Sequence, residues 1–401
     1  MTSPLTGVRI LAVEHYFSGP YGSQMLADAG ADVIKIEPPG VGDASRTAGA
    51  VEIGDQMVPV NFLRLNRNKR SVTIDLKSER GRAVFLDLVA QADVVWENLA
   101  PGTMDRLGIG AAELEHRNPQ LVYASVTGFG QAPQLRGPLW DRKAFDFITQ
   151  AMSGLMWLPS GGTAPQWLGF QLTDLYPGVL AAFGVLLALR QRETTGAGDQ
   201  VDVAMYDSAV ALNEKVVALY ALTGRAPTGP GDLQMTNQLG IFAAANGYFV
   251  IGVVDDASWP SLCQLIDRAD LIEDPRTTSR NGRTDHLDDV VRPAIARWSG
   301  GVSRDDAVKL LASLRIPVGA VQQVDEVLTC PQLEARNMLV RYEDTPWGSF
   351  TAIGNPVKLV RTGEPSLRPP PSLGEHTTEV LQELLNMTEA DVDALRAAGV
   401  V

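Results

Sequence analysis

The stretch VRILAVEHYFSGPYGSQMLADAGADVIKIE, Val8–Glu37, decides the fold that we expect for this chain. Val8–Val13 is short, apolar and rich in branched side chains, which is typical of a buried strand. Ser18-Gly19-Pro20 is a turn that leads into a helix over roughly Tyr21–Ala29, and Ala31–Glu37 is a second strand. A strand, a helix and a strand in this order predict a parallel sheet with a right-handed crossover.

The alternation of strands and helices continues along the chain. We expect strands at Ser71–Leu76, Asp93–Glu97, Leu121–Val126 and Gln200–Met205, and helices at Glu79–Ala92 and Tyr206–Thr223. Residues 38–60 are rich in Gly, Pro and Asp and indicate a long loop. An Asn-Gly turn between apolar runs predicts a hairpin over Phe242–Val254, and amphipathic helices follow over Trp259–Leu314.

These elements predict an α/β protein with two domains. A Rossmann-like large domain with a parallel sheet takes residues 1–224, a smaller α+β domain takes residues 225–330, and residues 331–401 return to the large domain. The best linker is Gly224–Gly231, which contains two prolines. Ligands on such sheets bind beyond the carboxyl ends of the strands, and His15 follows the first strand.

The composition argues against several classes of protein. The chain has 401 residues, a net charge of -13 and only two cysteines. The negative charge disfavours nonspecific nucleic-acid binding, and two cysteines make no disulfide framework, so a reducing compartment fits best. The N-terminus lacks a signal-peptide pattern, and the apolar run Val179–Leu189 is shorter than the about 20 residues that span a bilayer. We therefore expect a cytoplasmic protein with no nucleic-acid or membrane partner.

The motifs of several common enzyme classes do not occur in the sequence. The four histidines are scattered and show no metal-ligand spacing, so we expect no metal site. No glycine-rich dinucleotide loop follows the first strand, and neither a phosphate-binding GKS loop nor a GxSxG elbow occurs. Dehydrogenase, NTPase and hydrolase chemistry is therefore disfavoured.

The strongest candidate for chemistry is Asp174, in the stretch QLTDLYPG, Gln171–Gly178, just ahead of an apolar helix. An Asp at this place is commonly an N-cap that satisfies backbone N–H groups. The same place puts a carboxylate near the positive end of a helix dipole, which would keep it ionised and able to act as a nucleophile. The local sequence leaves both interpretations open.

A basic, amide-rich segment, NRNKRS at Asn66–Ser71, precedes a predicted strand. It is either a solvated loop, which is the default for charged residues, or a phosphate grip in which Lys69 and Arg70 donate charge-assisted hydrogen bonds. Arg106 and Lys143 lie outside the regular apolar patterns and are candidates to join such a grip.

Several different short motifs follow one another over almost the whole chain. They include GADVIKIE at Gly30–Glu37, NKRS at Asn68–Ser71, TGFGQ at Thr127–Gln131, QAMSG at Gln150–Gly154 and LGEHT at Leu373–Thr377. Together with Asp174 they make the chain resemble the family III CoA-transferases, the CaiB/BaiF-like superfamily. The resemblance implies a Rossmann-like large domain built from both ends of the chain, a small domain, and an interlocked homodimer.

The resemblance also implies an enzyme that moves CoA from an acyl-CoA to an acceptor carboxylic acid, with coenzyme A as a substrate and no tightly bound cofactor. Asp174 matches the nucleophile, which forms a mixed anhydride and then an aspartyl-CoA thioester. Arg106 and Lys143 resemble CoA-contacting residues, Asn98 lies in the segment that lines the CoA site, and His15 matches a position near its entrance.

Other positions depart from the family pattern around the acyl group. Phe17 stands where formyl-CoA transferase has a glutamine, and Asp146 replaces an active-site glutamate. Farther from the acyl group, Pro38 stands where that enzyme has an arginine near the nucleotide, and the glycine-rich active-site loop of that enzyme is not visible near Asn237–Ala245. Formyl-CoA and oxalate are therefore not expected as substrates. With Phe145, Phe17 suggests a larger or more apolar acid in the substrate pocket.

Two alternatives stay open at this point. An α-methylacyl-CoA racemase of the same superfamily needs a His and an Asp as an acid/base pair, and those enzymes carry Gly-His-Asp where this chain has Ala144-Phe145-Asp146. A protein that only binds CoA would keep Arg106 and Lys143 but would not need Asp174.

Overall fold

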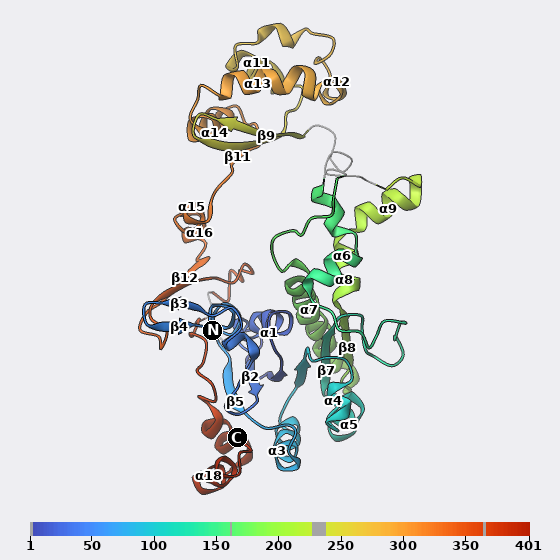
Figure 1. Cartoon of the computed structure of the whole chain (residues 1–401), viewed down its shortest axis with the longest axis vertical. Helices are drawn as coiled ribbons and strands as arrows, with labels where there is room; N and C mark the ends of the chain where they lie inside the picture. The colour runs from blue at the N-terminus through green and yellow to red at the C-terminus, as the bar shows by residue number, and fades with distance from the viewer. Residues whose placement is uncertain (1–2, 161–162, 227–237, 364–365) are drawn as a thin grey trace. The chain divides into compact units, whose positions relative to one another are not determined.

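The computed structural model describes residues 3–160, 163–226, 238–363 and 366–401 of the chain, shown in Figure 1. The chain forms two compact units. Unit 1 comprises Met1–Ala226 and Arg336–Val401, and unit 2 comprises Pro227–Ala335. The linker expected at Gly224–Gly231 lies outside the described residues from residue 227 onward.

Unit 1 is built on a six-stranded parallel sheet with the strand order β5-β2-β1-β6-β7-β8. Its strands are β1 (Arg9–Val13), β2 (Asp32–Glu37), β5 (Arg70–Thr73), β6 (Val94–Glu97), β7 (Val122–Thr127) and β8 (Gln200–Ala204). Counted along the chain, these six strands lie in the order 3-2-1-4-5-6, which is the doubly wound order. The prediction of an α/β fold with a parallel sheet is confirmed.

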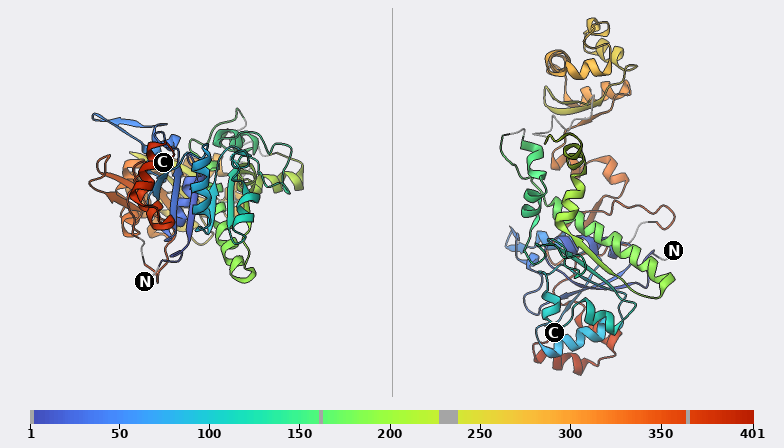
Figure 2. Two further views of the ribbon diagram at one scale, coloured as in Figure 1. Left: turned by 90° about the horizontal axis from the view of Figure 1, so that it is seen from below. Right: turned by 90° about the vertical axis from the view of Figure 1, so that its right-hand side faces the viewer.

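Helices cover both faces of this sheet, as Figure 2 shows from two sides. Successive strand residues point to opposite faces, so Ile10 and Leu11 enter different cores. One core is completed by α1 (Ser18–Asp28) and α7 (Leu172–Thr195). The other is completed by α3 (Glu79–Val89), α5 (Ala111–Arg117), α17 (Thr377–Leu385) and α18 (Glu389–Ala397).

The C-terminal segment packs beside β5 in unit 1. The backbone N of His376 donates to Ser71 O at 2.9 Å, and the backbone N of Asp75 donates to Val400 O at 2.8 Å. Before these contacts the segment forms a hairpin of β12 (Leu339–Tyr342) and β13 (Phe350–Ile353). Residues far apart in the sequence therefore share one core.

The helices α1 and α7 touch through glycines. A Cβ on Gly22 would lie 2.3 Å from Gly178 O, and a Cβ on Gly178 would lie 2.3 Å from Ser18 O. Only glycine lets two helix backbones approach this closely. Ser18 begins α1 and Asp174 lies in the first turn of α7, so this contact joins the loop after β1 to the start of α7.

Some elements differ from the sequence expectation. Residues 38–60 contain more than a loop: they include η1 (Ala44–Arg46), β3 (Val51–Ile53) and β4 (Gln56–Val58), followed by α2 (Val60–Leu63). The single helix expected at Tyr206–Thr223 is two, because Asn213 leaves helical geometry and its Nδ2 donates to Ser153 O at 2.9 Å. The elements of this region are α4 (Thr103–Arg106), α6 (Asp146–Met152), η2 (Leu155–Ser160), α8 (Met205–Leu212) and α9 (Glu214–Thr223).

The helix α7 is longer than the run Val179–Leu189 suggested. It has 24 residues and is, by length and composition alone, apolar enough to cross a membrane. The core helix of a soluble protein passes the same test, and the buried residues Ala181 and Val185 of α7 pack in a core with strands of the sheet. We therefore describe α7 as a core helix of unit 1.

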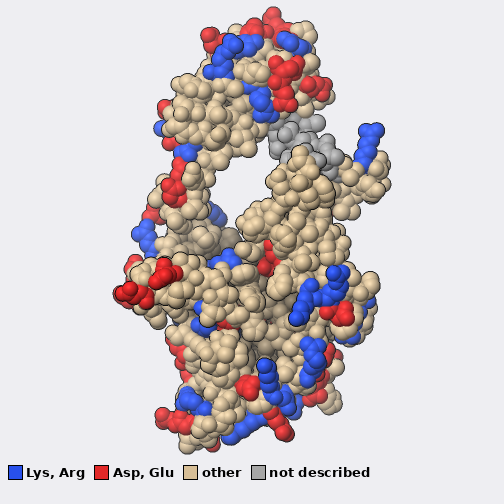
Figure 3. Space-filling view, in the orientation of Figure 1, with Lys and Arg blue, Asp and Glu red and all other residues tan. Residues whose placement is uncertain are grey.

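Unit 2 is an α+β unit with a three-stranded antiparallel sheet in the order β11-β10-β9. The hairpin expected at Phe242–Val254 is confirmed by the pairing of β9 and β10. The elements are β9 (Gln238–Ala244), β10 (Gly247–Val253), α11 (Trp259–Leu265), η3 (Ala269–Ile272), α12 (Arg280–Asp285), η4 (Leu287–Val291), α13 (Arg292–Ser299), α14 (Arg304–Ser313), β11 (Val318–Ala320), α15 (Val324–Leu328) and α16 (Pro331–Ala335). Figure 3 shows Lys and Arg intermingled with Asp and Glu over the helices of this unit.

Candidate active site

A cavity of about 630 Å³ lies at the carboxyl ends of β1, β6 and β7 in unit 1. β1 and β6 are neighbours at the point where the strand order reverses, and doubly wound sheets bind their ligands there. The cavity is lined by His15, Tyr16, Phe17, Ser18, Ala44, Ala48, Gly49, Asn61, Asn98, Leu99, Ala100, Pro101, Val126, Thr127, Gly128, Lys143, Ala144, Phe145, Asp174 and Met205. The structure thus brings six of the predicted site residues to one cavity: His15, Phe17, Asn98, Lys143, Phe145 and Asp174.

Asp174 lies in the first turn of α7 and faces this cavity. It is not the N-cap, because the helix begins at Leu172 and the capping position is held by Gln171, whose side chain makes no capping hydrogen bond. The N-cap interpretation of Asp174 is therefore wrong. Its carboxyl group is left to face the cavity.

The protonation of Asp174 also differs from the expectation of a fully ionised carboxylate. Burial, and next the negative charge of Asp146, raise the pKa of Asp174 from 3.8 to about 7, while the positive charge of Arg64 opposes this shift. Near neutral pH the acid and its anion therefore coexist. Such a partly desolvated carboxylate is a reactive form of the group, because little water must be removed before it attacks.

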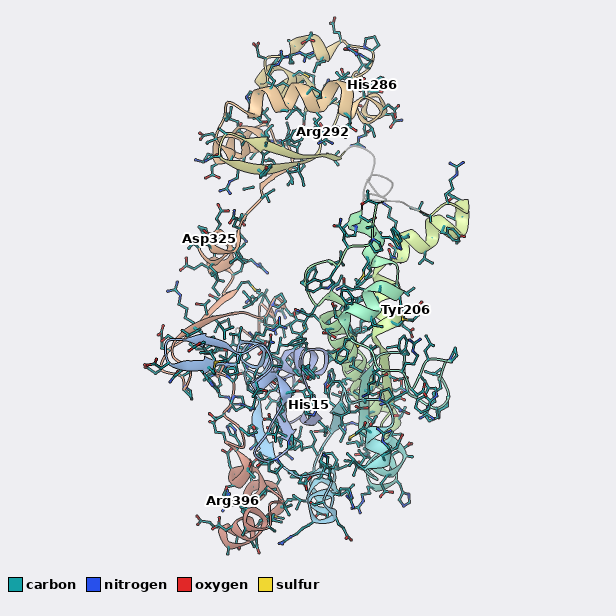
Figure 4. The ribbon with its side chains drawn as sticks, in the orientation of Figure 1. His15, Tyr206, His286, Arg292, Asp325 and Arg396 are labelled. Atoms are coloured by element: carbon teal, nitrogen blue, oxygen red, sulfur yellow. The ribbon has the colours of Figure 1, made fainter. Side chains whose placement is uncertain are left out.

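His15 and Asn98 join the ends of β1 and β6. The backbone N of His15 donates to Asn98 Oδ1 at 2.8 Å, and Asn98 Nδ2 donates to His15 O at 2.9 Å. Burial, and next the charge of Lys35, lower the pKa of His15, so its ring is neutral at pH 7. Figure 4 labels His15 in unit 1, where it forms part of the cavity wall.

A buried ion network lies next to the loop after β1. Lys35 Nζ lies 2.8 Å from Asp43 Oδ2, and the backbone N of Tyr16 donates to Asp43 Oδ1 at 3.1 Å. That hydrogen bond helps to hold Tyr16 at a φ of 59°, an uncommon angle for a non-glycine residue. Lys69 Nζ lies 2.8 Å from Glu14 Oε1 in the same network. The network therefore supports the loop that carries His15 and Phe17.

The structure does not bring Lys69 and Arg70 to the cavity, which corrects the expectation of a phosphate grip there. Lys69 Nζ is fully buried and donates to Glu14 Oε1 at 2.8 Å and to Pro20 O and Asn66 Oδ1, both at 2.9 Å. These partners use its three protons. Arg70 is held by Asp32, Glu379 and Glu383. Except for Asn66, their partners come from segments distant in the sequence, and both residues belong to the frame of unit 1.

Lys143 and Arg106 are the exposed cations near the cavity. Lys143 lines it and forms no ion pair with the described residues. Arg106 does not line the cavity. Its Nη1 donates a hydrogen bond at 3.3 Å to the backbone O of Pro101, and Pro101 is part of the cavity wall. Each therefore places an exposed positive charge in the cavity wall or next to it.

The three residues predicted for the substrate pocket separate into two groups. Phe17 and Phe145 line the cavity. Asp146 does not, because its carboxylate is turned toward the start of α7, where Oδ1 accepts from the backbone N of Thr173 at 2.9 Å. Asp146 is a positioning residue for α7, which corrects its expected place in the pocket.

Arg64 and Glu97 lie near the cavity but were not predicted as site residues from the sequence. Arg64 follows α2, and its guanidinium lies 4.5 Å from the ring centre of Phe17. Glu97 ends β6, its Oε2 accepts from the backbone N of Leu99 at 2.7 Å, and burial raises its pKa to about 7. An arginine between two leucines in the run VNFLRL was the available signal for Arg64, since a charge inside an apolar stretch needs a partner.

Among the residues that the structure describes, no group of three or more His, Cys, Asp or Glu side chains is placed to hold a metal ion. The described polar side chains in the cavity wall are one carboxyl group, one imidazole, one ammonium group, two amides and the hydroxyl groups of Tyr16, Ser18 and Thr127.

The comparisons with known proteins fit this site. The family model of CoA-transferase family III matches residues 5–377. The acetyl-CoA:oxalate CoA-transferase of Acetobacter aceti is 37% identical over 95% of this chain and 95% of its own length. The succinyl-CoA:mesaconate CoA-transferase of Haloarcula marismortui is 36% identical over 94% of this chain and 96% of its own.

A solved structure gives the same result for the fold. A CaiB/BaiF family protein from Brucella suis superposes with a TM-score of 0.84 at 30% identity, covering 96% of this chain and 100% of that protein. The predicted family resemblance is confirmed. The chain belongs to CoA-transferase family III, the CaiB/BaiF family of enzymes that transfer CoA between carboxylic acids.

Proposed function

We propose that this enzyme transfers CoA through covalent intermediates on Asp174. The observation that carries the proposal is the place of Asp174: it is the carboxyl group of the cavity wall, at the reversal point of the sheet, with a pKa near neutrality. Exchange of CoA between two carboxylic acids needs a nucleophile that is itself a carboxylate, because each acid must take the place of the other in an anhydride.

The steps balance without an added reagent. The Asp174 carboxylate attacks the acyl-CoA carbonyl, the C–S bond breaks, and a mixed anhydride and CoA thiolate form. The thiolate attacks the Asp174 carbonyl carbon and releases the donor acid, which leaves an aspartyl-CoA thioester. The acceptor carboxylate then attacks this thioester and displaces the CoA thiolate, which forms a second anhydride. The thiolate attacks the carbonyl carbon that comes from the acceptor acid. The products are a new acyl-CoA and the free Asp174 carboxylate.

We infer that the other cavity residues hold coenzyme A along this path. Lys143 supplies an exposed positive charge in the wall, and Arg106 supplies one next to Pro101. Asn98 and His15 are fixed to each other by two hydrogen bonds, so they offer a rigid edge against which the thioester end of CoA can lie. Phe17 and Phe145 form the apolar part of the acyl site.

An alternative is an α-methylacyl-CoA racemase, which moves a proton at the α-carbon. Phe145 lines the cavity at the position that resembles the racemase histidine, and a phenyl ring cannot carry a proton. This observation favours transfer. Incorporation of deuterium at the α-carbon of an acyl-CoA, in D2O and without an acceptor acid, would support the racemase instead.

We further propose that the enzyme works as an interlocked homodimer. Large apolar side chains are exposed on α6, η2 and α7, among them Phe147, Trp157, Phe183 and Leu187. Figure 3 shows the surface over α6 and α8 largely free of charge. Because α6 contacts both η2 and α7, these exposed apolar side chains lie on neighbouring elements, which favours an interface there. Sedimentation of the wild type should give a dimer, and a stable monomer with full activity would contradict this.

The covalent mechanism is tested by trapping. After incubation with an acyl-CoA and then hydroxylamine, peptide mass spectrometry should find a hydroxamate on Asp174, and borohydride should reduce the same side chain. Asp174→Ala should remove both the label and CoA transfer. The matched control is Asp87→Ala on α3, an exposed carboxylate away from the cavity. Retained transfer in Asp174→Ala would overturn the proposal.

A further inference from the structure

Glu97 is a buried carboxyl group that the proposed transfer chemistry does not use. It ends β6, its side chain is almost fully buried, and it does not line the cavity. Its Oε2 accepts from the backbone N of Leu99 at 2.7 Å, and its Oε1 accepts from the hydroxyl of Tyr123 at 3.3 Å and from Gln131 Nε2. Burial of a carboxyl group is costly unless such donors surround it. Its partners therefore indicate what Glu97 holds in place.

Gln131 extends these contacts to the start of α4. While its Nε2 donates to Glu97, its Oε1 accepts from the backbone N of Gly102 at 3.2 Å. Gly102 directly precedes α4, whose last residue is Arg106. The backbone of Gln131 is itself fixed to β8, because its N donates to Asp202 Oδ2 at 3.0 Å. The side-chain amide of Gln131 therefore bridges Glu97 and the residue before α4.

The backbone N–H groups of Leu99 and Gly102 bracket one wall of the cavity. They belong to the loop of residues 98–102, which we call the wall loop, and most of this loop lines the cavity: Asn98, Leu99, Ala100 and Pro101. Neither Glu97 nor Gln131 lines the cavity, so both act on it only through the wall loop.

We propose that Glu97 and Gln131 are positioning residues that hold the wall loop in the conformation that binds acyl-CoA. The inference rests on the proposed function, because it assumes that the wall loop contacts CoA. A loop that is already in its binding conformation need not be ordered when the ligand arrives, and this saves binding free energy. The hydrogen bonds of the pair join β6, β7 and the wall loop, whereas Asp174 lies on α7. The pair should therefore affect acyl-CoA binding more than the chemical steps.

The polarity of the two side chains gives a sharp test. Both ends of this chain of contacts are backbone donors, from Leu99 and from Gly102. The pair must therefore present two acceptors outward and make one donor–acceptor contact between its members. One carboxylate and one amide meet this requirement in either order, but two amides cannot, because whichever way they turn, one donor faces another. Glu97→Gln should thus break the arrangement, and the exchange Glu97→Gln with Gln131→Glu should restore it.

The variants are compared by exchange kinetics with acetyl-CoA or succinyl-CoA and an excess of its own isotope-labelled acid. Burial raises the pKa of Glu97 to about 7, so the measurements are made at pH 8, where this group is mostly ionised. Glu97→Gln should raise KM for the acyl-CoA about tenfold, the effect of one mispaired buried group. The exchanged pair should return this KM to within about threefold of the wild type, although it carries one more substitution. KM for the acid and kcat should stay within about threefold throughout.

The matched control is Glu389→Gln on α18, which removes an exposed carboxylate and should leave both KM values unchanged. A lower kcat with an unchanged KM in Glu97→Gln would show that the pair only keeps the protein folded, since a smaller folded fraction lowers the rate but not KM. An exchanged pair with a KM no lower than that of Glu97→Gln would show that the hydrogen bonds between the two side chains do not position the loop. Either result overturns the proposal.

A second variant keeps the test decisive if Glu97→Gln does not fold, which thermal unfolding shows. Gln131→Met changes a partly buried side chain, removes the bridge to Gly102 and leaves the contact between Glu97 and Leu99. It should raise KM for the acyl-CoA in the same direction, and a wild-type KM would overturn the proposal. Failure of the covalent mechanism is a separate result, because it would appear as CoA transfer that survives Asp174→Ala, whatever the KM values.

Discussion

Asp146 holds Thr173, the residue that precedes Asp174, by two hydrogen bonds. Asp146 Oδ1 accepts from the backbone N and from Oγ1 of Thr173, both at 2.9 Å. Its Oδ2 accepts from Gln150 Nε2 at 2.7 Å and from Trp167 Nε1 at 3.2 Å. One carboxylate thus fixes the start of α7, and its charge also helps to raise the pKa of the next carboxyl group.

The pH dependence of the reaction should follow the ionisation of Asp174. Only the carboxylate attacks a thioester, and burial raises the pKa of Asp174 to about 7. We expect kcat/KM for the acyl-CoA to rise about tenfold per pH unit below that value and to level off above it. A profile of kcat/KM from pH 5 to pH 9, measured in parallel for the wild type and the control Asp87→Ala, tests this dependence. A rate that stays flat down to about pH 5 contradicts it.

The stability of the protein should also depend on this group. The pKa of Asp174 is higher in the folded state than its ordinary 3.8, so the unfolded state binds fewer protons between these values. The contribution of Asp174 to the free energy of unfolding is therefore most favourable below pH 3.8 and becomes less favourable as the pH rises to about 7. Asp174→Asn removes the penalty and should raise the free energy of unfolding at pH 8 by on the order of 1–3 kcal/mol.

Urea unfolding of wild type and Asp174→Asn at pH 5 and pH 8 checks this sign. The stabilisation should be larger at pH 8. An equal effect at both values would assign it to a lost contact rather than to the charge.

Lys69→Met should destabilise the protein without directly weakening CoA binding. Removing the ammonium group leaves Glu14 with less compensation for its burial, and breaking a buried pair costs about 3–5 kcal/mol. Chemical unfolding measures this loss, and KM for the acyl-CoA in the remaining folded protein should stay within about twofold of wild type. A raised KM for the acyl-CoA with an unchanged free energy of unfolding would contradict this prediction and support Lys69 as a phosphate contact.

Lys143→Ala should show the opposite pattern. The side chain is exposed in the cavity wall and supports no described ion pair, so its loss should leave stability within about 0.5 kcal/mol of wild type. KM for the acyl-CoA should rise about tenfold, because one charged contact to the ligand is gone. Steady-state kinetics beside the exposed-lysine control Lys77→Ala measures the difference. An unchanged KM would mean that Lys143 is a solvated surface residue.

The sequence predicted what depends on local periodicity and on ordered motifs. The unit Val8–Glu37 gave the first strand, helix and strand because each element has its own apolar pattern. Asp174 was identified because it stands ahead of a long apolar run within a family pattern. Neither feature requires knowledge of contacts between distant residues.

What the sequence could not predict depends on partners far away in the chain. Lys69 looks like a solvated cation, yet its partners Glu14 and Pro20 are 55 and 49 positions away. Arg64 is near Phe17 only through the packing of α2 against the loop after β1. The break at Asn213 follows from a hydrogen bond to Ser153, 60 positions earlier.

The glycine contact between α1 and α7 has a consequence for redesign of the enzyme. Gly22 and Gly178 fix the distance between two helices, while Phe17 and Phe145 only fill space in front of them. Substitution of the two phenylalanines should therefore reshape the cavity without moving Asp174. The two glycines must be kept, because one added methyl group would push the helix that carries Asp174 away from α1 and the loop after β1.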